Sequence, residues 1–290
     1  MAAELPLCTT FASIAPQAKV PPWIHAAIFR LSVMSFRWAG VVPLAPLNVN
    51  RFPPFGNAGC VEYKGAVDIV TEMDRRAEAL IISRIRETFP DHGFLTEESA
   101  EITSASGRRW IIDPLDGTTN YSHGFPMFCV SIAFEDSGGV TTGVIYDPML
   151  DELFVAEKGK GATLNGSPVK VSSTDKLDKS LLATGFPYDL RTSENNNLDH
   201  FYNFAVRAQA IRRAGSAALD MCYIACGRFD GFWEMKLNPW DTAAGALMIE
   251  EAGGGLSDFS GGEFSIYGKE CLATNGRIHA EMLDVLMKRF

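Results

Sequence analysis

The amino-acid sequence predicts a layered α+β fold, on three observations. Between residues 128 and 156, apolar runs of strand length are separated by the turn signals Ser137-Gly138-Gly139 and Asp147-Pro148, as in an antiparallel meander. After residue 180, strand-like and helix-like runs alternate. The 290 residues are 47% hydrophobic and 21% charged, a composition that allows a large buried core. We therefore expect sheets and helices stacked in layers, as one large domain or two closely packed halves.

The N-terminal segment, residues 1–60, differs from the rest of the chain. It holds eight of the 15 prolines, and Glu4 is the only acidic residue before Glu62. We expect little regular structure there except a helix over Trp23 to Gly40, where apolar side chains approach helical spacing before Pro43. An organelle transit peptide is the alternative for such a basic start, against which its few serines and many prolines argue.

The first orderly element is a predicted helix that begins after Thr71. Thr71 and Asp74 have the spacing of a capping box. Apolar side chains recur on one face of this helix, at Ala77, Leu80, Ile81 and Ile85. The helix should end before Pro90, since the residue before a proline disfavours helical geometry. A short apolar strand, Trp110-Ile111-Ile112, then runs into Asp113-Pro114.

The predicted meander follows. Its strands are Phe128 to Phe134, Val140 to Tyr146 and Leu153 to Ala156, and Asn165-Gly166 is a further hairpin turn. Gly159-Lys160-Gly161 lacks the spacing of a phosphate-binding P-loop, so we interpret it as a turn between strands.

The second half of the chain alternates between strands and helices. Its expected elements are a strand at Leu181 to Thr184, a helix at His200 to Ile211, a helix at Ser216 to Cys226, a strand at Gly231 to Glu234, a helix at Thr242 to Ala252, a strand at Cys271 to Thr274 and a helix from His279. Gly253 is the kind of residue that ends a helix.

Charge, hydropathy and cysteine usage exclude several classes of function. A net charge of -9 leaves no general basic surface for nucleic acid, so a small anionic substrate would need local cations. No apolar stretch reaches the roughly 18 residues that cross a bilayer. The six cysteines form no CxxC pair, which favours a reducing compartment. We expect a soluble cytoplasmic protein that binds neither nucleic acid nor membrane.

The segment Asp113-Pro114-Leu115-Asp116-Gly117-Thr118-Thr119-Asn120 carries the strongest chemical signal. Two carboxylates three positions apart, with a proline between them, can point into one cleft together with the Leu115 carbonyl. Such hard oxygen ligands suit Mg²⁺. The backbone N–H groups of Gly117-Thr118-Thr119 would then face an anion such as phosphate. Taken alone, the segment could also be a capped turn with two solvated acids.

Two further acidic sites lie elsewhere in the chain. Leu95-Thr96-Glu97-Glu98-Ser99 follows the first helix, and Trp240 to Gly245 is followed by Glu250 to Gly254. Asp241 could instead be a helix N-cap, with small residues after it that allow tight helix packing. Each segment taken separately is explained as well by structure as by function.

Together, the segments resemble the inositol monophosphatase family. The resemblance extends from about Lys64 to the C-terminus, more than three quarters of the chain, and rests on four motifs in the family's order. These are Val67 to Asp74, Thr96 to Ser99, Trp110 to Tyr121 and Trp240 to Gly254. The stretches Ala183 to Pro187 and Arg212 to Asp220 are especially similar to bacterial members.

The resemblance implies a layered αβαβα sandwich of the sugar phosphatase type, usually a homodimer. A catalytic domain would span residues 61–290, with a metal-binding half at about 61–175 and an α/β half at about 176–290. The active site would lie where the halves meet. Family members generally begin with a long amphipathic helix, and the proline-rich residues 1–60 depart from that pattern.

The resemblance also implies two or three bound Mg²⁺ ions. Glu97, Asp113 and the Leu115 carbonyl would bind a first ion, and Asp113, Asp116 and Asp241 a second, with Glu97 also near a weaker third site. Physical reasoning agrees, since carboxylates about 4 Å apart repel each other by about 4 kcal/mol per pair at a protein-like dielectric. Bound Mg²⁺ would reverse this field, lower the pKa of a coordinated water and clamp the attacking and leaving oxygens.

The remaining implied roles concern water, phosphate and substrate. Thr118, hydrogen-bonded to Asp74, would orient or activate the attacking water, and the amides of Gly117 and Thr118 would hold the phosphate. Gly215-Ser216-Ala217 and Glu234 match positions that contact substrate hydroxyls. The expected reaction is direct hydrolysis of inositol monophosphate or a similar small polyol or sugar phosphate. Fructose 1,6-bisphosphate and histidinol phosphate are the alternatives, and lithium inhibition is expected.

Three other functions are less consistent with the sequence. Cys222 and Arg228 have the C-x5-R spacing of cysteine-dependent phosphatases, but the segment has the pattern of a buried helix face, so a reactive thiolate is not expected. The five histidines form no HExxH-like cluster. A non-catalytic binding protein that keeps the fold is the rival from another class, against which the intact acidic ligands argue.

Overall fold

The computed structural model describes residues 61–63 and 69–288. The helix predicted over Trp23 to Gly40, like all of the proline-rich N-terminal segment, lies outside the described residues.

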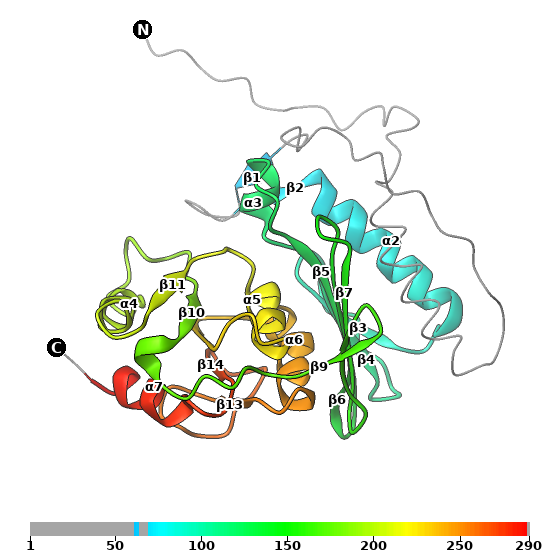
Figure 1. Ribbon diagram of the computed structural model, residues 1–290. Helices are drawn as coiled ribbons and strands as arrows, with labels where there is room; N and C mark the ends of the chain where they lie inside the picture. The colour runs from blue at the N-terminus through cyan, green and yellow to red at the C-terminus, as the bar shows by residue number, and fades with distance from the viewer. Residues whose placement is uncertain (1–60, 64–68, 289–290) are drawn as a thin grey trace, which may run out of the picture.

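Five layers are stacked in the order helix, sheet, helices, sheet, helices (Figure 1). One outer layer is the helix α2 (Glu72–Thr88), which packs on a seven-stranded sheet. The central layer is the pair α5 (Ala217–Ala225) and α6 (Pro239–Glu251), between this sheet and a five-stranded sheet. The helices α4 (Leu198–Ala205) and α7 (His279–Leu286) cover the far face of the five-stranded sheet. The predicted layered αβαβα sandwich is confirmed.

The seven-stranded sheet is a meander with one parallel pair at its edge. Its strands, in spatial order, are β3 (Gly93–Thr96), β4 (Arg109–Asp116), β5 (Cys129–Asp136), β6 (Gly139–Asp147), β7 (Glu152–Glu157), β8 (Gly161–Leu164) and β9 (Ser167–Val169). β3 and β4 are parallel, and every later pair is antiparallel. Asn165 and Gly166, between β8 and β9, have φ values of 50° and 81°, the left-handed backbone that a tight hairpin requires. The predicted strands and turn are confirmed.

The five-stranded sheet is mixed. Its strands, in spatial order, are β11 (Ala210–Arg212), β10 (Leu181–Thr184), β12 (Gly231–Met235), β14 (Glu270–Thr274) and β13 (Gly255–Ser257). β10 is parallel to β11 and β12, whereas β14 is antiparallel to β12 and β13. The smaller elements are β1 (Val61–Tyr63), β2 (Ile69–Thr71), α3 (Thr118–Ser122) and the 3-10 turn Leu177–Lys179.

Side chains alternate between the two faces of each sheet, and this alternation builds separate cores. On β4, Ile111 packs with the central helices, whereas Ile112 packs with α2. On β12, Phe232 packs with the central helices, whereas Trp233 packs with α4 and α7. The central strands are therefore buried on both faces, which explains why they are continuous apolar runs in the sequence.

The helix α6 is enclosed by its neighbours. Its residues from Thr242 to Ile249 are all buried, as expected for a helix that is apolar all round. Its contact with β6 depends on Gly143, since a Cβ atom there would lie 2.9 Å from the Ala244 carbonyl oxygen. This packing holds α6, which carries Asp241 in its first turn, against the seven-stranded sheet.

The start of α6 corrects one interpretation of the sequence. The N-cap is Asn238 and Pro239 is the first helical residue, so the interpretation of Asp241 as the N-cap is wrong. Asp241 is the third helical residue, and its Oδ2 accepts a hydrogen bond from the Asn238 backbone N–H at 2.7 Å. The two residues form a capping box.

The helix predicted over His200 to Ile211 also differs from the structure. α4 begins earlier and ends at Ala205. Residues Ala210–Arg212 form the edge strand β11 instead, paired with Leu181, Leu182 and Ala183 of β10. The apolar residues keep helical spacing through this segment, but its conformation is determined by strand pairing with β10, which is distant in the sequence.

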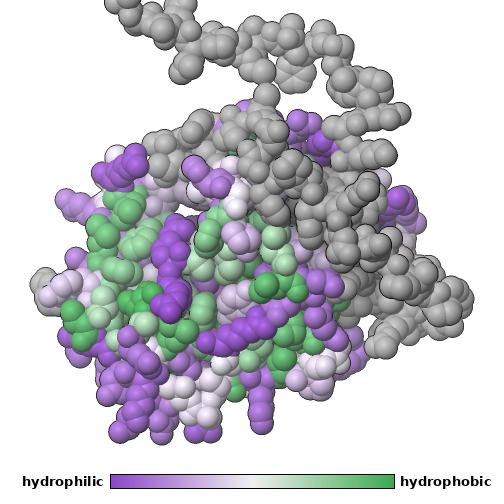
Figure 2. Space-filling view, turned by 45° about the horizontal axis from the view of Figure 1, so that its top comes forward, coloured by the Kyte–Doolittle hydropathy of each residue, from purple (hydrophilic) through white to green (hydrophobic). Residues whose placement is uncertain are grey.

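The surface mixes both kinds of residue. On the face shown in Figure 2, hydrophobic and hydrophilic residues are interspersed. Within the described ranges, no helix has the length and apolar character needed to cross a bilayer.

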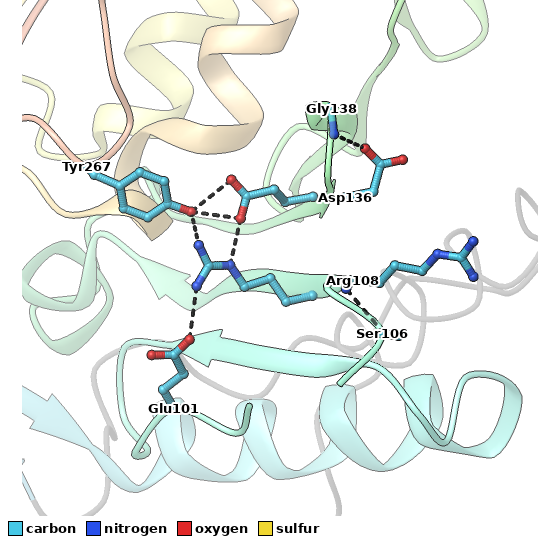
Figure 3. Close-up of polar contacts among 8 residues, drawn as sticks. Glu101, Ser106, Arg108, Asp136, Gly138 and Tyr267 are labelled. Atoms are coloured by element: carbon cyan, nitrogen blue, oxygen red, sulfur yellow. Dashed lines mark hydrogen bonds and ion pairs between the residues drawn. The ribbon is translucent and has the colours of Figure 1, made fainter. Parts of the chain in front are cut away.

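A polar cluster on the surface connects the two sheets (Figure 3). Arg109 on β4 donates hydrogen bonds to Glu135 at 2.6 Å and to Glu101 at 2.9 Å. Tyr267, from the loop between β13 and β14, accepts a hydrogen bond from Arg109 and donates one to Glu135. The cluster ties a loop of the five-stranded sheet to the seven-stranded sheet.

Candidate active site

A cavity of about 320 Å³ lies where segments of both sheets meet, within the size range of small-molecule sites. Its lining includes all but one of the predicted site residues: Glu97, Asp113, Leu115, Asp116, Gly117, Thr118, Gly215, Ser216, Ala217, Glu234 and Asp241. The exception is Asp74, which is buried behind Thr118. Residues distant in the sequence are therefore brought together.

The two aspartates of β4 reach one cavity because the strand is irregular between them. Residues three apart in a regular strand point to opposite faces. β4 pairs with β5 at Asp113↔Ser131 and Asp116↔Cys129, so three steps on β4 match two on β5. Pro114 lies in this bulge, where a missing N–H is tolerated. The strand predicted to end before Asp113 therefore continues to Asp116, and the bulge redirects its acidic side chains.

Asp113 is held by its own backbone segment. Its Oδ1 accepts a hydrogen bond from the Leu115 N–H at 2.9 Å, and the residue is 2% exposed. Burial raises the pKa of the Asp113 carboxyl well above its ordinary value, and the negative charges of Glu97, Asp116 and Asp241 raise it further. The side chain is therefore costly to keep ionised without a nearby cation.

Asp116 connects β4 to the N-terminus of α5. Its Oδ2 accepts hydrogen bonds from the Ser216 hydroxyl at 2.6 Å and the Ala218 N–H at 2.9 Å. The backbone N–H groups at this helix end favour a negative charge. Burial raises the pKa of Asp116, while these hydrogen bonds act in the opposite direction. Ser216 is at the same time the N-cap of α5, accepting from Leu219 N–H at 3.3 Å.

Asp241 is oriented by the capping box of α6. Burial raises the pKa of Asp241 well above its usual value, the hydrogen bond from Asn238 lowers it, and the charges of Asp116 and Glu97 raise it. The same carboxylate therefore caps a helix and faces other acids.

The three aspartates have the donor chemistry of a divalent metal site. One oxygen of each is oriented by hydrogen bonds from the protein, and all are hard donors of the type that Mg²⁺ prefers. Burial raises the pKa of all three carboxyls, and neighbouring negative charges raise it further at Asp113 and Asp241, a cost that a cation would relieve. Within residues 61–63 and 69–288, no three carboxylate, imidazole or thiol groups are close enough together to enclose an ion as they stand.

Thr118 lies between the cavity and Asp74. Its hydroxyl group is 2.9 Å from Asp74 Oδ1 and 3.0 Å from the Leu115 carbonyl oxygen, and it can donate its single hydrogen to either. Burial raises the pKa of Asp74, whereas hydrogen bonds from Thr71 and Thr118 lower it. The pair is arranged as a hydroxyl with a buried carboxylate acceptor behind it.

The turn after β4 depends on Gly117. Its φ of 97° is in the left-handed region, and a Cβ atom would lie 2.8 Å from the Met127 carbonyl oxygen. Asn120, one turn later, donates hydrogen bonds to the Met127 and Ala214 carbonyl oxygens at 2.7 and 2.8 Å. This amide joins the Gly117 turn to the segment that leads into Gly215.

The opposite wall of the cavity is formed by Gly215 to Ala217 and by Glu234 on β12. Gly215 has a φ of 88°, a conformation that favours glycine. Burial raises the pKa of Glu234 to about 8, and the positive charge of Arg213 counteracts this. The wall thus offers backbone groups and one acid that burial makes harder to ionise.

The sequence interpretation assigned no role to several other residues of the cavity. Asp220 lines it and is 1% exposed, yet its Oδ1 has no hydrogen-bond partner. Gly185, Arg213 and Lys236 also line it. Asp220 had a detectable signal, because it is the single charged residue in the apolar run Ala217–Ala225.

The cysteine alternative is not supported by the structure. Cys222 is fully buried in α5, and burial raises the pKa of its thiol well above the ordinary value. Arg228 is paired with Glu152 instead of facing the cavity. No histidine lines the cavity among the residues described.

The chain is similar to known proteins along most of its length. Residues 52–288 match the model of the inositol monophosphatase family. An inositol-1-monophosphatase of Synechocystis sp. is 46% identical over 237 residues, 81% of this chain and 83% of that protein. The Nus factor SuhB of Escherichia coli is 45% identical over 76% of this chain and 83% of its own length. A solved inositol monophosphatase structure from Anabaena matches with a TM-score of 0.72 and 47% identity, over 74% of this chain and 86% of that one.

Proposed function

The chain belongs to the inositol monophosphatase family and is a phosphoric monoester hydrolase, and from this premise we propose that it hydrolyses inositol monophosphate or a similar small polyol or sugar phosphate with Mg²⁺. The observation that carries the proposal is the convergence of Glu97, Asp113, Asp116 and Asp241 on one cavity, beside Gly117 and Thr118. Burial and neighbouring negative charges oppose the ionisation of Asp113 and Asp241, an arrangement that is typical of functional sites.

Two Mg²⁺ ions are proposed, with a weaker third near Glu97. Glu97, Asp113 and the Leu115 carbonyl would hold the first, and Asp113, Asp116 and Asp241 the second. When bound, the ions supply positive charge to the phosphate and lower the pKa of a coordinated water. Burial raises the pKa of Asp113, and the charges of Glu97, Asp116 and Asp241 raise it further, which supports this assignment.

The protein's own groups would orient the reaction. Thr118 would accept a hydrogen bond from the attacking water while its own hydrogen goes to Asp74. The backbone N–H groups of Gly117 and Thr118 would hold the phosphate oxygens, so that water attacks phosphorus directly and the polyol leaves. No phosphorylated protein side chain is formed, and this agrees with the inert environment of Cys222.

The polyol would lie against the opposite wall. Backbone groups of Gly215, Ser216 and Ala217 and the carboxylate of Glu234 would contact its hydroxyls. Burial raises the pKa of Glu234 by more than the charge of Arg213 lowers it, to about 8. Near pH 7 its protonated carboxyl can both donate to and accept from hydroxyls, and after ionisation it only accepts.

Three further properties belong to the proposal. We expect lithium inhibition, a homodimer and a cytoplasmic location. We also propose that the catalytic domain, residues 61–290, divides near residue 175 into a metal-binding half and an α/β half. The two sheets, built from residues 93–169 and 181–274, support this division.

A substrate panel tests the function. Inositol 1-phosphate, fructose 1,6-bisphosphate and histidinol phosphate would each be incubated with the purified chain in Mg²⁺, in EDTA and in Mg²⁺ with Li⁺, and phosphate release measured. We expect the largest kcat/KM for inositol 1-phosphate, and no activity in EDTA. A higher kcat/KM for either other substrate would reassign the substrate. Failure on all three in ample Mg²⁺ would favour a non-catalytic binding protein.

A further inference from the structure

The carboxyl group of Glu234 lies against the bare α-carbon of Gly185. A Cβ atom added at Gly185 would overlap both carboxyl oxygens and the carboxyl carbon of Glu234. Gly185 does not have a positive φ, so the requirement for glycine is steric. Both residues line the cavity. The missing side chain of Gly185 is therefore the space in which the acid lies.

Asn197 holds both sides of this contact. Its side-chain amide donates hydrogen bonds to the Gly185 carbonyl oxygen at 2.6 Å and to Thr184 Oγ1 at 3.0 Å. Its Oδ1 accepts from Trp233 Nε1 at 2.8 Å, and Trp233 directly precedes Glu234 on β12. Thr184 Oγ1 donates to the Trp233 carbonyl oxygen at 2.6 Å. One buried amide thus connects the end of β10 to the residue before Glu234.

The backbone at Asn197 suits this residue type. Its φ is 70°, and the residue is 3% exposed. Asparagine adopts the left-handed region more readily than most other residues, and here it immediately precedes α4 as its N-cap. The residue that connects Gly185 to Trp233 is therefore also the residue that begins α4.

We propose that Gly185 is a specificity-determining residue for the hydroxyl-bearing part of the substrate, and that Asn197 is the positioning residue that holds it. The inference rests on the proposed function, in which Glu234 accepts hydrogen bonds from substrate hydroxyls. A side chain at position 185 displaces the flexible end of Glu234 and leaves the aspartates of β4 and α6 in place. Recognition of the polyol then fails while the phosphate chemistry continues.

The expected effect is a change in selectivity. A site built to bind hydroxyl groups discriminates strongly, because a displaced acid leaves polar groups unpaired. The measured quantity is kcat/KM for inositol 1-phosphate divided by kcat/KM for p-nitrophenyl phosphate, which is a phosphomonoester without hydroxyl groups. In Gly185→Ala we expect this ratio to fall about 10- to 100-fold, mostly through KM.

Matched variants separate this effect from general damage. Gly255→Ala is the control, because a Cβ atom there would have only ordinary contacts, the nearest at 3.4 Å, and the ratio should stay within twofold of the wild type. Asn197→Gly keeps the left-handed backbone and removes the amide bridge, and we expect a smaller fall of about 3- to 10-fold. In a Glu234→Ala background, Gly185→Ala should change the ratio less than twofold, since the displaced group is gone.

Each outcome decides the proposal. An unchanged ratio in Gly185→Ala overturns it, whether both activities are retained or both fall equally, the second case indicating general damage. If Gly185→Ala does not fold, as judged by its melting temperature, the ratio in Asn197→Gly decides instead. A wild-type protein that hydrolyses neither substrate overturns the proposed function itself, a result distinct from any effect of position 185.

Discussion

The hydroxyl of Thr118 donates a hydrogen bond to Asp74, with 2.9 Å between Thr118 Oγ1 and Asp74 Oδ1, although the residues are 44 positions apart. The other oxygen of Asp74 accepts from the backbone N–H and hydroxyl of Thr71, closing the capping box of α2. One buried carboxylate therefore starts a helix and orients a cavity hydroxyl. Its position is fixed by secondary structure before any ligand binds.

Replacing Thr118 tests whether this hydroxyl participates in the reaction. We expect Thr118→Ala to lower kcat by about 10²- to 10⁴-fold, the usual range for a lost proton-transfer group. Thr118→Ser keeps the hydroxyl and should retain most of the activity. Steady-state kinetics on inositol 1-phosphate would measure both. Equal activity in Thr118→Ala and the wild type would remove Thr118 from the mechanism.

Asp241→Asn tests the second metal site. The amide can still accept the hydrogen bond from the Asn238 N–H, so α6 should form normally, whereas the charge for the cation is lost. We expect kcat to fall at least about 100-fold, with circular dichroism unchanged. Asn238→Ala is the matched control, because it weakens the same helix cap without touching the carboxylate, at a cost of about 1 kcal/mol in stability. A fully active Asp241→Asn would exclude Asp241 as a ligand.

The buried acid Glu234 makes stability depend on pH. Its pKa in the folded protein is about 8, against 4.5 for an ordinary glutamate. The folded state therefore holds this proton where the unfolded state has released it, and stability falls as pH rises from about 4.5 to about 8. The slope from this one residue is at most about 1.4 kcal/mol per pH unit. We expect the melting temperature of metal-free Glu234→Gln to fall less steeply over this range than that of the wild type.

Bound cations should reduce the loss of stability at high pH. The aspartates of the cavity also have raised pKa values, so Mg²⁺ should raise the melting temperature more at pH 8 than at pH 5. An equal Mg²⁺ effect at both values would argue against cation binding by these acids. Parallel pH profiles for the wild type and Glu234→Gln would contradict the role of Glu234 in the slope.

Cys222→Ala distinguishes hydrolysis by water from a thiolate mechanism. Cys222 is fully buried with a raised thiol pKa, so we expect kcat to stay within about threefold of the wild type and the stability to fall by about 1 kcal/mol for the lost packing. Treatment of the folded wild type with iodoacetamide should not inactivate it through this residue. Loss of activity in a folded Cys222→Ala would revive the C-x5-R interpretation.

The sequence predicted the elements whose signals are local. The Thr71 capping box, the Asn165-Gly166 hairpin and the three meander strands are confirmed, because each depends on neighbouring residues alone. The helix predicted to Ile211 was wrong where strand pairing with β10 decides the conformation. Local patterns cannot contain information about such a distant partner.

The candidate site was predicted unevenly for the same reason. Its acidic residues occur in motifs, and eleven of the twelve predicted site residues line one cavity. The bulge at Pro114 that turns two acids toward it requires the pairing with β5. Gly185 and Asp220 lie in stretches that resemble the family, but neither was assigned a role from the sequence, because the contact of Gly185 with Glu234 and the burial of Asp220 in the cavity wall appear only in the folded chain.

Gly143 on β6 packs closely against Ala244 on α6. Substitutions at Gly143, outside the cavity, should therefore also affect catalysis. α6 packs on the seven-stranded sheet and carries Asp241 in its first turn. A larger side chain at position 143 on β6 should therefore shift α6, and with it Asp241, although Asp241 is not in contact with position 143. Gly143 is absent from the cavity lining, yet a larger residue there should lower activity because a Cβ atom would lie 2.9 Å from the Ala244 carbonyl oxygen. Searches for inactivating variants, or for compensating ones, should therefore include the strand behind the helix.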